Sequence, residues 1–237
     1  MAMLPLILPC PPQMRPFLTA DPKEALVHGV TADLYIYCKV RSTFVSSKLA
    51  KSFALTPDVK SFIEDNWREV PMKTSYKFSP KFGHLHEPLA CSLYAKKTGR
   101  TVRTCRNVVN PKIPFLITAP DGLVFTDKGF ETAIEIKTIT DVKSKDDYRL
   151  IRCCEHRNGG WVLRTRTETY AQIQFTMLSL ALESMDLVLY FPCMKDILVV
   201  KVKRDTFYQN SLIQRVYDRY VKHLVPHLIS KLNDKSK

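Results

Sequence analysis

Residues 119–137 read APDGLVFTDKGFETAIEIK, and this stretch decides the fold. Short strands, broken by proline and glycine, are predicted within it and around it. Glu135 and Lys137 are two residues apart on one strand, so both side chains leave the same face, while Ile136 points into the core. Asp121 lies where a strand meets a glycine turn. Asp121 and Glu135 can therefore meet at one end of a hairpin, with Lys137 beside them.

These carboxylates have the chemistry of a metal site. Mg²⁺ is a hard cation that takes oxygen ligands, Mn²⁺ is accepted by the same oxygens, and the backbone carbonyl of Ile136 offers a further one. Two ions would stabilise both the attacking and the leaving oxygen of a phosphodiester, with Lys137 positioning the water or neutralising the phosphate. The competing interpretation is a solvated strand of alternating charges. The apolar neighbours of Glu135 and Lys137 favour the site.

Outward from this stretch, the order is helices, a strand meander, a helix, two strands and a helix. Helices are predicted at 21–54, from an N-cap at Thr56 to about 70, at 81–98, from Thr167 to about 183, and at 205–232. Strands are predicted at 108–109, 114–118, 122–125, 132–138, 187–191 and 197–203, with a hairpin in 148–166 turning at Asn158-Gly159.

This order predicts an α/β fold with a mixed central sheet flanked by helices. We expect a single domain over residues 1–237. Its predicted parts are an N-terminal helical part at 1–78, a catalytic core at 79–205 and a C-terminal helix at 206–237.

The composition narrows the function. The 237 residues carry a net charge of +13, which favours a polyanionic partner, either nucleic acid or an anionic membrane surface. Seven cysteines with no CxxC pair argue against a disulfide framework, and adjacent Cys153 and Cys154 with His156 form a poor zinc site. Neither a signal peptide nor a membrane span is evident. We expect an intracellular protein, in nucleus or cytoplasm and not secreted.

Two further motifs accompany the charged strand in chain order. Glu87 ends the segment Gly83-His84-Leu85-His86-Glu87, and Gln172 and Gln174 lie in Tyr170-Ala171-Gln172-Ile173-Gln174. Together with Pro120-Asp121-Gly122 and Glu135-Ile136-Lys137, this set resembles the PD-(D/E)xK nucleases of the phage lambda exonuclease type. That group includes YqaJ-like viral recombinases and viral alkaline exonucleases. The matched region covers about residues 80–205.

The resemblance implies a restriction-endonuclease-like core and a metal-dependent DNA exonuclease. It implies Glu87, Asp121 and Glu135 as metal ligands, Lys137 as catalytic lysine, and Gln172 as the residue that orients Lys137, the water or the phosphate. The implied activity is 5′→3′ digestion of double-stranded DNA, which leaves a single-stranded tail for recombination or repair. A single-strand annealing protein is then the expected partner, and some family members form trimers.

The chain also departs from the family pattern. Ala119 replaces the serine before Pro120, and Lys137 and Gln172 are separated by the long hairpin segment 148–166. Its arginines could contact DNA phosphates, or the hairpin could simply be solvated. The family holds the 5′ phosphate with an arginine and a serine, for which Arg41 and Ser47 lie in the right region at an ill-fitting spacing. The residues taken as candidates for DNA contact are Arg41, Ser47, Arg152, Arg164, Arg166 and Gln174.

Three functions therefore compete: the exonuclease, an endonuclease or flap nuclease with the same site, and a catalytically silent DNA-binding scaffold. A fourth, a basic membrane-surface protein, lacks any long amphipathic basic helix except the terminal one, so no membrane partner is expected. The complete charged set argues against the scaffold.

Overall fold

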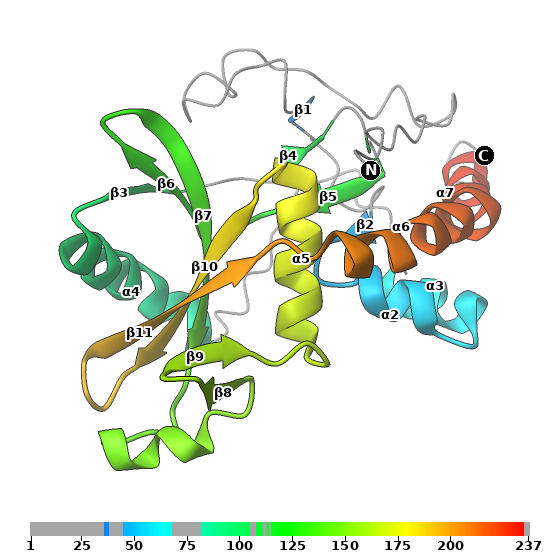
Figure 1. The fold of residues 1–237 in the computed structure, drawn as a ribbon. Helices are drawn as coiled ribbons and strands as arrows, with labels where there is room; N and C mark the ends of the chain where they lie inside the picture. Colours follow the sequence, from blue (N-terminus) through cyan, green and yellow to red (C-terminus); the bar gives the residue numbers. More distant parts are fainter. Residues whose placement is uncertain are drawn as a thin grey trace.

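The structure is a computed structural model that describes residues 36–37, 45–67, 82–104, 108–110, 113 and 115–234. A five-stranded sheet of order β11-β10-β7-β6-β3 lies at its centre (Figure 1). Its strands are β3 (Thr101–Arg103), β6 (Gly122–Thr126), β7 (Gly129–Thr138), β10 (Ser184–Phe191) and β11 (Asp196–Lys203). β7 and β10 run parallel, and the other neighbouring pairs run antiparallel. The sheet is therefore mixed, as predicted.

The two faces of this sheet are covered by two helices, α4 (Phe82–Thr98) and α5 (Glu168–Leu180). Along β10, Val188 shares a core cluster with Tyr94 of α4, whereas Leu189 shares another with Ile173 of α5. Neighbouring strand residues point to opposite faces, so the helices cover opposite sides. α5 also joins the parallel strands β7 and β10, which need a crossover of this kind. The predicted α/β fold is confirmed.

A second core gathers elements from both ends of the described chain. A four-stranded sheet of order β1-β4-β5-β2 is formed by β1 (Ile36–Tyr37), β2 (Val45–Ser46), β4 (Val108–Val109) and β5 (Leu116–Thr118). The helices beside it are α2 (Ala50–Leu55), α3 (Val59–Asn66), α6 (Thr206–Arg219), the π-helical η4 (Tyr220–Leu224) and α7 (Val225–Asp234). Phe53, Phe115 and Tyr220 are fully buried between them. Figure 1 shows these helices together at one end of the molecule, away from β3 and α4.

The structure corrects the predicted N-terminal helices. Within the predicted helix 21–54, only the end is helical, as α2. β1 and β2 are strands, residues 47–49 form a turn, and the other residues of this range lie outside the described ones. The next helix begins at Val59, because the N-cap is Asp58, whose carboxylate accepts from the Ser61 amide at 3.0 Å. Thr56 is instead the C-cap of α2. β3 was not among the predicted strands.

The hairpin and the last helix follow the prediction more closely. β8 (Cys154–Arg157) and β9 (Gly160–Leu163) pair antiparallel, and the turn residues Asn158 and Gly159 both have positive φ, as a two-residue hairpin turn requires. A 3-10 helix, η3 (Lys145–Leu150), precedes them. The C-terminal helix is interrupted by η4 just before Pro226, whose ring clashes with an α-helical carbonyl four residues earlier.

Candidate active site

β7 places Glu135 and Lys137 side by side. Their ion pair measures 2.7 Å from Nζ to Oε1. The Glu135 carboxylate is almost wholly buried, with its side chain 3% exposed, while that of Lys137 is 31% exposed. Ile136 points to the opposite face and packs with Tyr94 and Ala90 of α4. The predicted division of β7 into a charged face and a core face is confirmed.

Asp121 is tied to the same strand. It directly precedes β6, its amide donates to the Ile134 carbonyl at 3.1 Å, and its Oδ2 accepts from the Ile136 amide at 2.6 Å. The following glycine is required by packing, since a Cβ atom at Gly122 would lie 2.5 Å from Cγ1 of Val102. The Asp-Gly pair therefore supplies a carboxylate at the end of β6 where the next residue leaves no room for a side chain.

α5 brings Gln172 to the pair from the other side. Its amide Nε2 donates to Glu135 Oε1 at 2.7 Å, and its Oε1 accepts from Lys137 Nζ at 3.3 Å. α5 begins at the predicted N-cap, where the Thr167 hydroxyl accepts from the Tyr170 amide at 3.1 Å. Gln172 thus links both charged groups of β7 and fixes their relative position.

Glu87 approaches from the first half of α4. Its side chain is half-buried, and its negative charge adds to the larger effect of burial, which raises the pKa of Asp121, of Glu135 and of the Cys91 thiol. α4, β6, β7 and α5 therefore each contribute one polar group or more to the end of the sheet where β6 begins. The structure brings together Glu87, Asp121, Glu135, Lys137 and Gln172.

This cluster holds three carboxylates, and Lys137 is the one cation among its residues. Burial, together with the neighbouring Glu135 carboxylate, raises the pKa of Asp121 to about 8, although the hydrogen bond from the Ile136 amide opposes the shift. Burial also raises the pKa of Glu135, with Lys137 acting in the opposite sense. For Lys137, burial lowers the pKa, but the Glu135 carboxylate outweighs it and the net shift is upward.

This cluster fits a divalent cation. Glu135 Oε2 is buried and makes no hydrogen bond within the described structure, so one acceptor is left for a ligand. A hard cation would also remove the repulsion that raises the pKa of Asp121. Among the described residues, no three His, Cys, Asp or Glu side chains are already arranged as a metal cage.

The predicted DNA-contact residues are less uniform. Arg152, Arg164 and Arg166 are exposed on or beside the hairpin, and Arg41 lies outside the described residues. Ser47 is buried, and its hydroxyl lies 3.2 Å from that of Thr118. Ser47 is therefore part of the interior here and not a surface contact.

Gln174 is fully buried, which corrects its assignment as a DNA contact. Its Nε2 donates to the Lys203 carbonyl at 2.9 Å, and its Oε1 accepts from the Asp205 amide at 2.8 Å. Both bonds join α5 to the segment between β11 and α6. Gln172 and Gln174 are two apart on a helix and cannot face the same way, so only the first reaches the charged cluster.

The position of Cys153 was not predicted from the sequence. Its Sγ lies 3.9 Å from Cys154 Sγ, and the hydrogen bond from that thiol, aided by the charges of Lys137 and Arg164, lowers the pKa of Cys153 to about 7. Only the fold brings residue 153 near Lys137, so no sequence signal could have shown it. For Cys153, Cys154 and His156, as for the carboxylate cluster, no preformed group of three ligands occurs among the described residues, so the zinc alternative stays a prediction.

Part of the sequence matches a known protein family. Residues 38–150 match the model of the YqaJ-like viral recombinase domain. The resemblance to the lambda exonuclease and YqaJ-like family is thereby confirmed, over a region that holds Glu87, Asp121, Glu135 and Lys137 and ends before α5. No curated protein matches the sequence.

Solved structures share the fold of this chain. The alkaline exonuclease LHK-Exo from Laribacter hongkongensis is similar with a TM-score of 0.58 at 19% identity, covering 83% of this chain and 94% of that one. A phage-related exonuclease from Haemophilus somnus 129PT is similar with a TM-score of 0.50 at 15% identity, covering 80% of this chain and 96% of that one. At these identities the likeness is one of fold. None of the helices in the described ranges has the length and apolar composition for crossing a membrane.

Proposed function

We propose that this protein is a metal-dependent deoxyribonuclease that digests double-stranded DNA from its 5′ ends and leaves a single-stranded tail. One observation carries the proposal: Lys137 Nζ is held at 2.7 Å from a buried carboxylate of Glu135 that keeps one oxygen without a hydrogen bond. A solvated surface strand would not bury such a group, because the desolvation of a carboxylate costs several kcal/mol, which an ion pair offsets only in part.

Each residue has a role in this proposal. Glu87, Asp121, Glu135 and the Ile136 carbonyl would hold Mg²⁺, with two ions expected and Mn²⁺ as a substitute. The bound cation would make water a stronger nucleophile and stabilise charge on the phosphate. Lys137 is partly exposed and can place its ammonium against the attacking water or the scissile phosphate.

Gln172 acts through its neighbours. By bonding to Glu135 and Lys137 at once, it keeps the ammonium from turning away when DNA binds. It is therefore a positioning residue, and the carboxylates and Lys137 are the groups in contact with metal and phosphate.

The substrate is inferred from charge and from likeness. A net charge of +13 favours a polyanion. Structural neighbours are exonucleases, and LHK-Exo was solved in complex with dAMP, a deoxynucleotide. A single-strand annealing protein and a second copy of the chain remain predicted partners.

The test is digestion of linear duplex DNA labelled at the 5′ or the 3′ end, beside a closed circle, in Mg²⁺ and in EDTA. Early release of the 5′ label, an intact circle and no digestion in EDTA are expected. Cutting of the circle would instead indicate an endonuclease with the same site. Intact DNA with either Mg²⁺ or Mn²⁺ would reduce the chain to a binding scaffold.

A further inference from the structure

The β8–β9 hairpin lies, in chain order, between the strand β7 and the helix α5 of the candidate active site. The segment between β7 and α5 contains η3, β8 and β9, so its two feet adjoin the elements that carry Lys137 and Gln172. The feet are closed by a hydrogen bond from the Arg164 amide to the Cys153 carbonyl at 2.8 Å.

The hairpin is held rigidly at its base. Ile151, Cys154 and Leu163 are buried in the core cluster that covers the α5 face of the central sheet. Tyr148 stacks on Phe191 of β10 with ring centroids 5.2 Å apart. A segment rooted in the core in this way keeps a fixed direction, unlike a surface loop that contacts only solvent.

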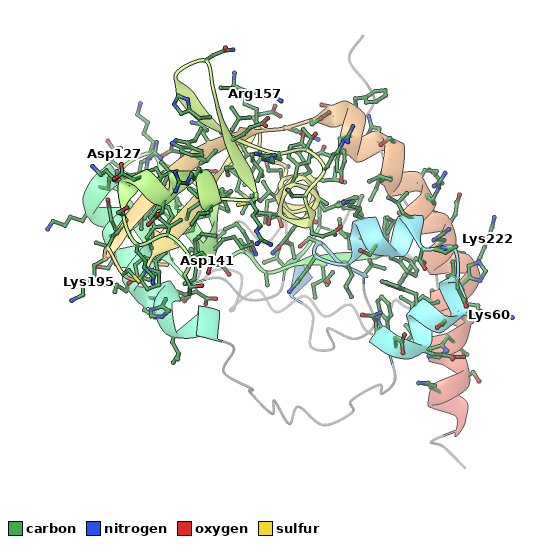
Figure 2. The ribbon with its side chains drawn as sticks, turned by 90° about the horizontal axis from the view of Figure 1, so that it is seen from below. Lys60, Asp127, Asp141, Arg157, Lys195 and Lys222 are labelled. Atoms are coloured by element: carbon green, nitrogen blue, oxygen red, sulfur yellow. The ribbon has the colours of Figure 1, made fainter. Side chains whose placement is uncertain are left out.

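Its free end is different in character. Figure 2 shows the hairpin standing out from the body, with Arg157 near its free end. The Arg157 side chain is 68% exposed and that of Arg164 is 50% exposed, and Arg152 is exposed at the first foot. Glu155 is the one acid on the two strands, and it pairs with Arg157 at 2.6 Å and lies 3.9 Å from Arg164. Two arginines outnumber the one carboxylate between them, so the hairpin keeps a net positive charge.

We propose that the β8–β9 hairpin is a DNA-contacting arm, on which Arg152 and Arg157 bind backbone phosphates of the duplex engaged at Lys137. The inference rests on the proposed nuclease function and adds a binding surface to it. Arginine forms charge-assisted hydrogen bonds with phosphate oxygens, and a rigid arm of fixed direction beside the scissile bond sets the register of the duplex without reading its sequence. A duplex is the occupant that this face fits, because its backbone phosphates carry the charge complementary to the exposed arginines.

The test compares two double variants of the full chain that lose the same charge. Arg152→Ala with Arg157→Ala removes the proposed contacts. Lys60→Ala with Lys222→Ala removes two cations from α3 and η4, at the opposite end of the molecule in Figure 2. Binding of a labelled duplex is measured in EDTA, so no cleavage occurs, over salt from about 50 to 200 mM.

The arginine variant should bind roughly tenfold more weakly, and its slope of log K against log salt should fall by about 2, since each phosphate contact releases about one counterion. The lysine variant should bind as the wild type does. Replacing both arginines by lysine should restore the slope, because lysine still serves as a point charge for phosphate.

Equal weakening in both alanine variants would overturn the proposal, because the effect would then follow net charge alone. Wild-type binding by the arginine variant would also overturn it and would point to a protein partner for the arm. If the wild type bound duplex but never cleaved it, the proposed nuclease function would be wrong, whereas the proposed DNA contact of the hairpin would stand. If the wild type did not bind duplex at all, both proposals would be wrong.

Discussion

At the scale of single residues, the proposed cleavage activity depends on the ammonium of Lys137. It compensates one oxygen of a buried carboxylate and stays accessible to substrate. Lys137→Ala should lower the rate of duplex cleavage by about 10²- to 10⁴-fold, the range expected for a positioned proton-transfer or charge-stabilising group. Duplex binding in EDTA should persist. Lys143 is an exposed lysine between β7 and η3, and the control variant Lys143→Ala should cleave normally. An unchanged cleavage rate in Lys137→Ala would exclude this lysine from catalysis.

The pKa of Asp121, raised to about 8 by burial and by Glu135, has a consequence for stability. In metal-free protein the folded state holds a proton that the unfolded chain has already lost above pH 3.8. The free energy of unfolding should therefore fall as pH rises through this window. The raised pKa of Glu135 acts in the same sense, whereas the lowered pKa of Cys153 acts oppositely above about 7. The range from about pH 5 to 7 isolates the carboxylates.

Urea unfolding in EDTA at several pH values across this range checks the sign. Asp121→Asn should flatten the decline, because the amide keeps an acceptor for the Ile136 amide and carries no charge. Asp127→Asn, an exposed aspartate in the β6–β7 turn, should leave the decline as in the wild type (Figure 2). Stability that rises with pH in the wild type would contradict the burial of an uncompensated acid.

At the scale of elements, the beginning of β6 depends on the absence of one methyl group. A Cβ atom at Gly122 would approach Val102 of β3 to 2.5 Å and Ile134 of β7 to 3.1 Å. Gly122→Ala should lower the free energy of unfolding by about 1–3 kcal/mol, as overpacking usually does. Val102→Ala in the same chain should recover part of the loss, since it removes the nearest atom. Gly160→Ala, where the nearest atom lies 4.0 Å away, is the matched control and should change stability little.

These elements also show what the sequence could predict. Strong local signals succeeded: the Thr167 N-cap, the Asn158-Gly159 turn and the two-residue period of Glu135 and Lys137 all occur where expected. Each depends on chemistry within a few residues. Thr56 failed as an N-cap, because Asp58 accepts the amide hydrogen bond and Thr56 ends the preceding helix.

What local signals could not reveal was the partner across the fold. Gln172 and Gln174 are the same residue type with different partners. Gln174 forms hydrogen bonds with the backbone of Lys203 and Asp205, whereas Gln172 forms them with the side chains of Glu135 and Lys137. The strand β3 is short, and its pairing with β6 depends on contacts more than fifteen residues away. Such features follow from tertiary packing, which overrides propensity in short elements.

At the scale of the whole molecule, the chain is strongly basic, but its candidate active site is rich in carboxylates. The net charge of +13 attracts DNA, while Glu87, Asp121 and Glu135 repel each other at the end of the sheet. A ligand that binds the folded chain and not the unfolded one raises the free energy of unfolding. Mg²⁺ should therefore raise the melting temperature in the absence of DNA, and EDTA should reverse the rise.

The size of this shift should depend on pH in a defined direction. Mg²⁺ must displace the proton that Asp121 holds below about pH 8, so the stabilisation should be larger at pH 8.5 than at pH 6. Glu135→Gln should remove most of it, because the buried oxygen that lacks a hydrogen bond then belongs to an amide. NaCl of equal ionic strength separates binding from screening. The same shift in wild type and Glu135→Gln would place the cation elsewhere, and the case for a metal-dependent nuclease at this sheet edge would fall with it.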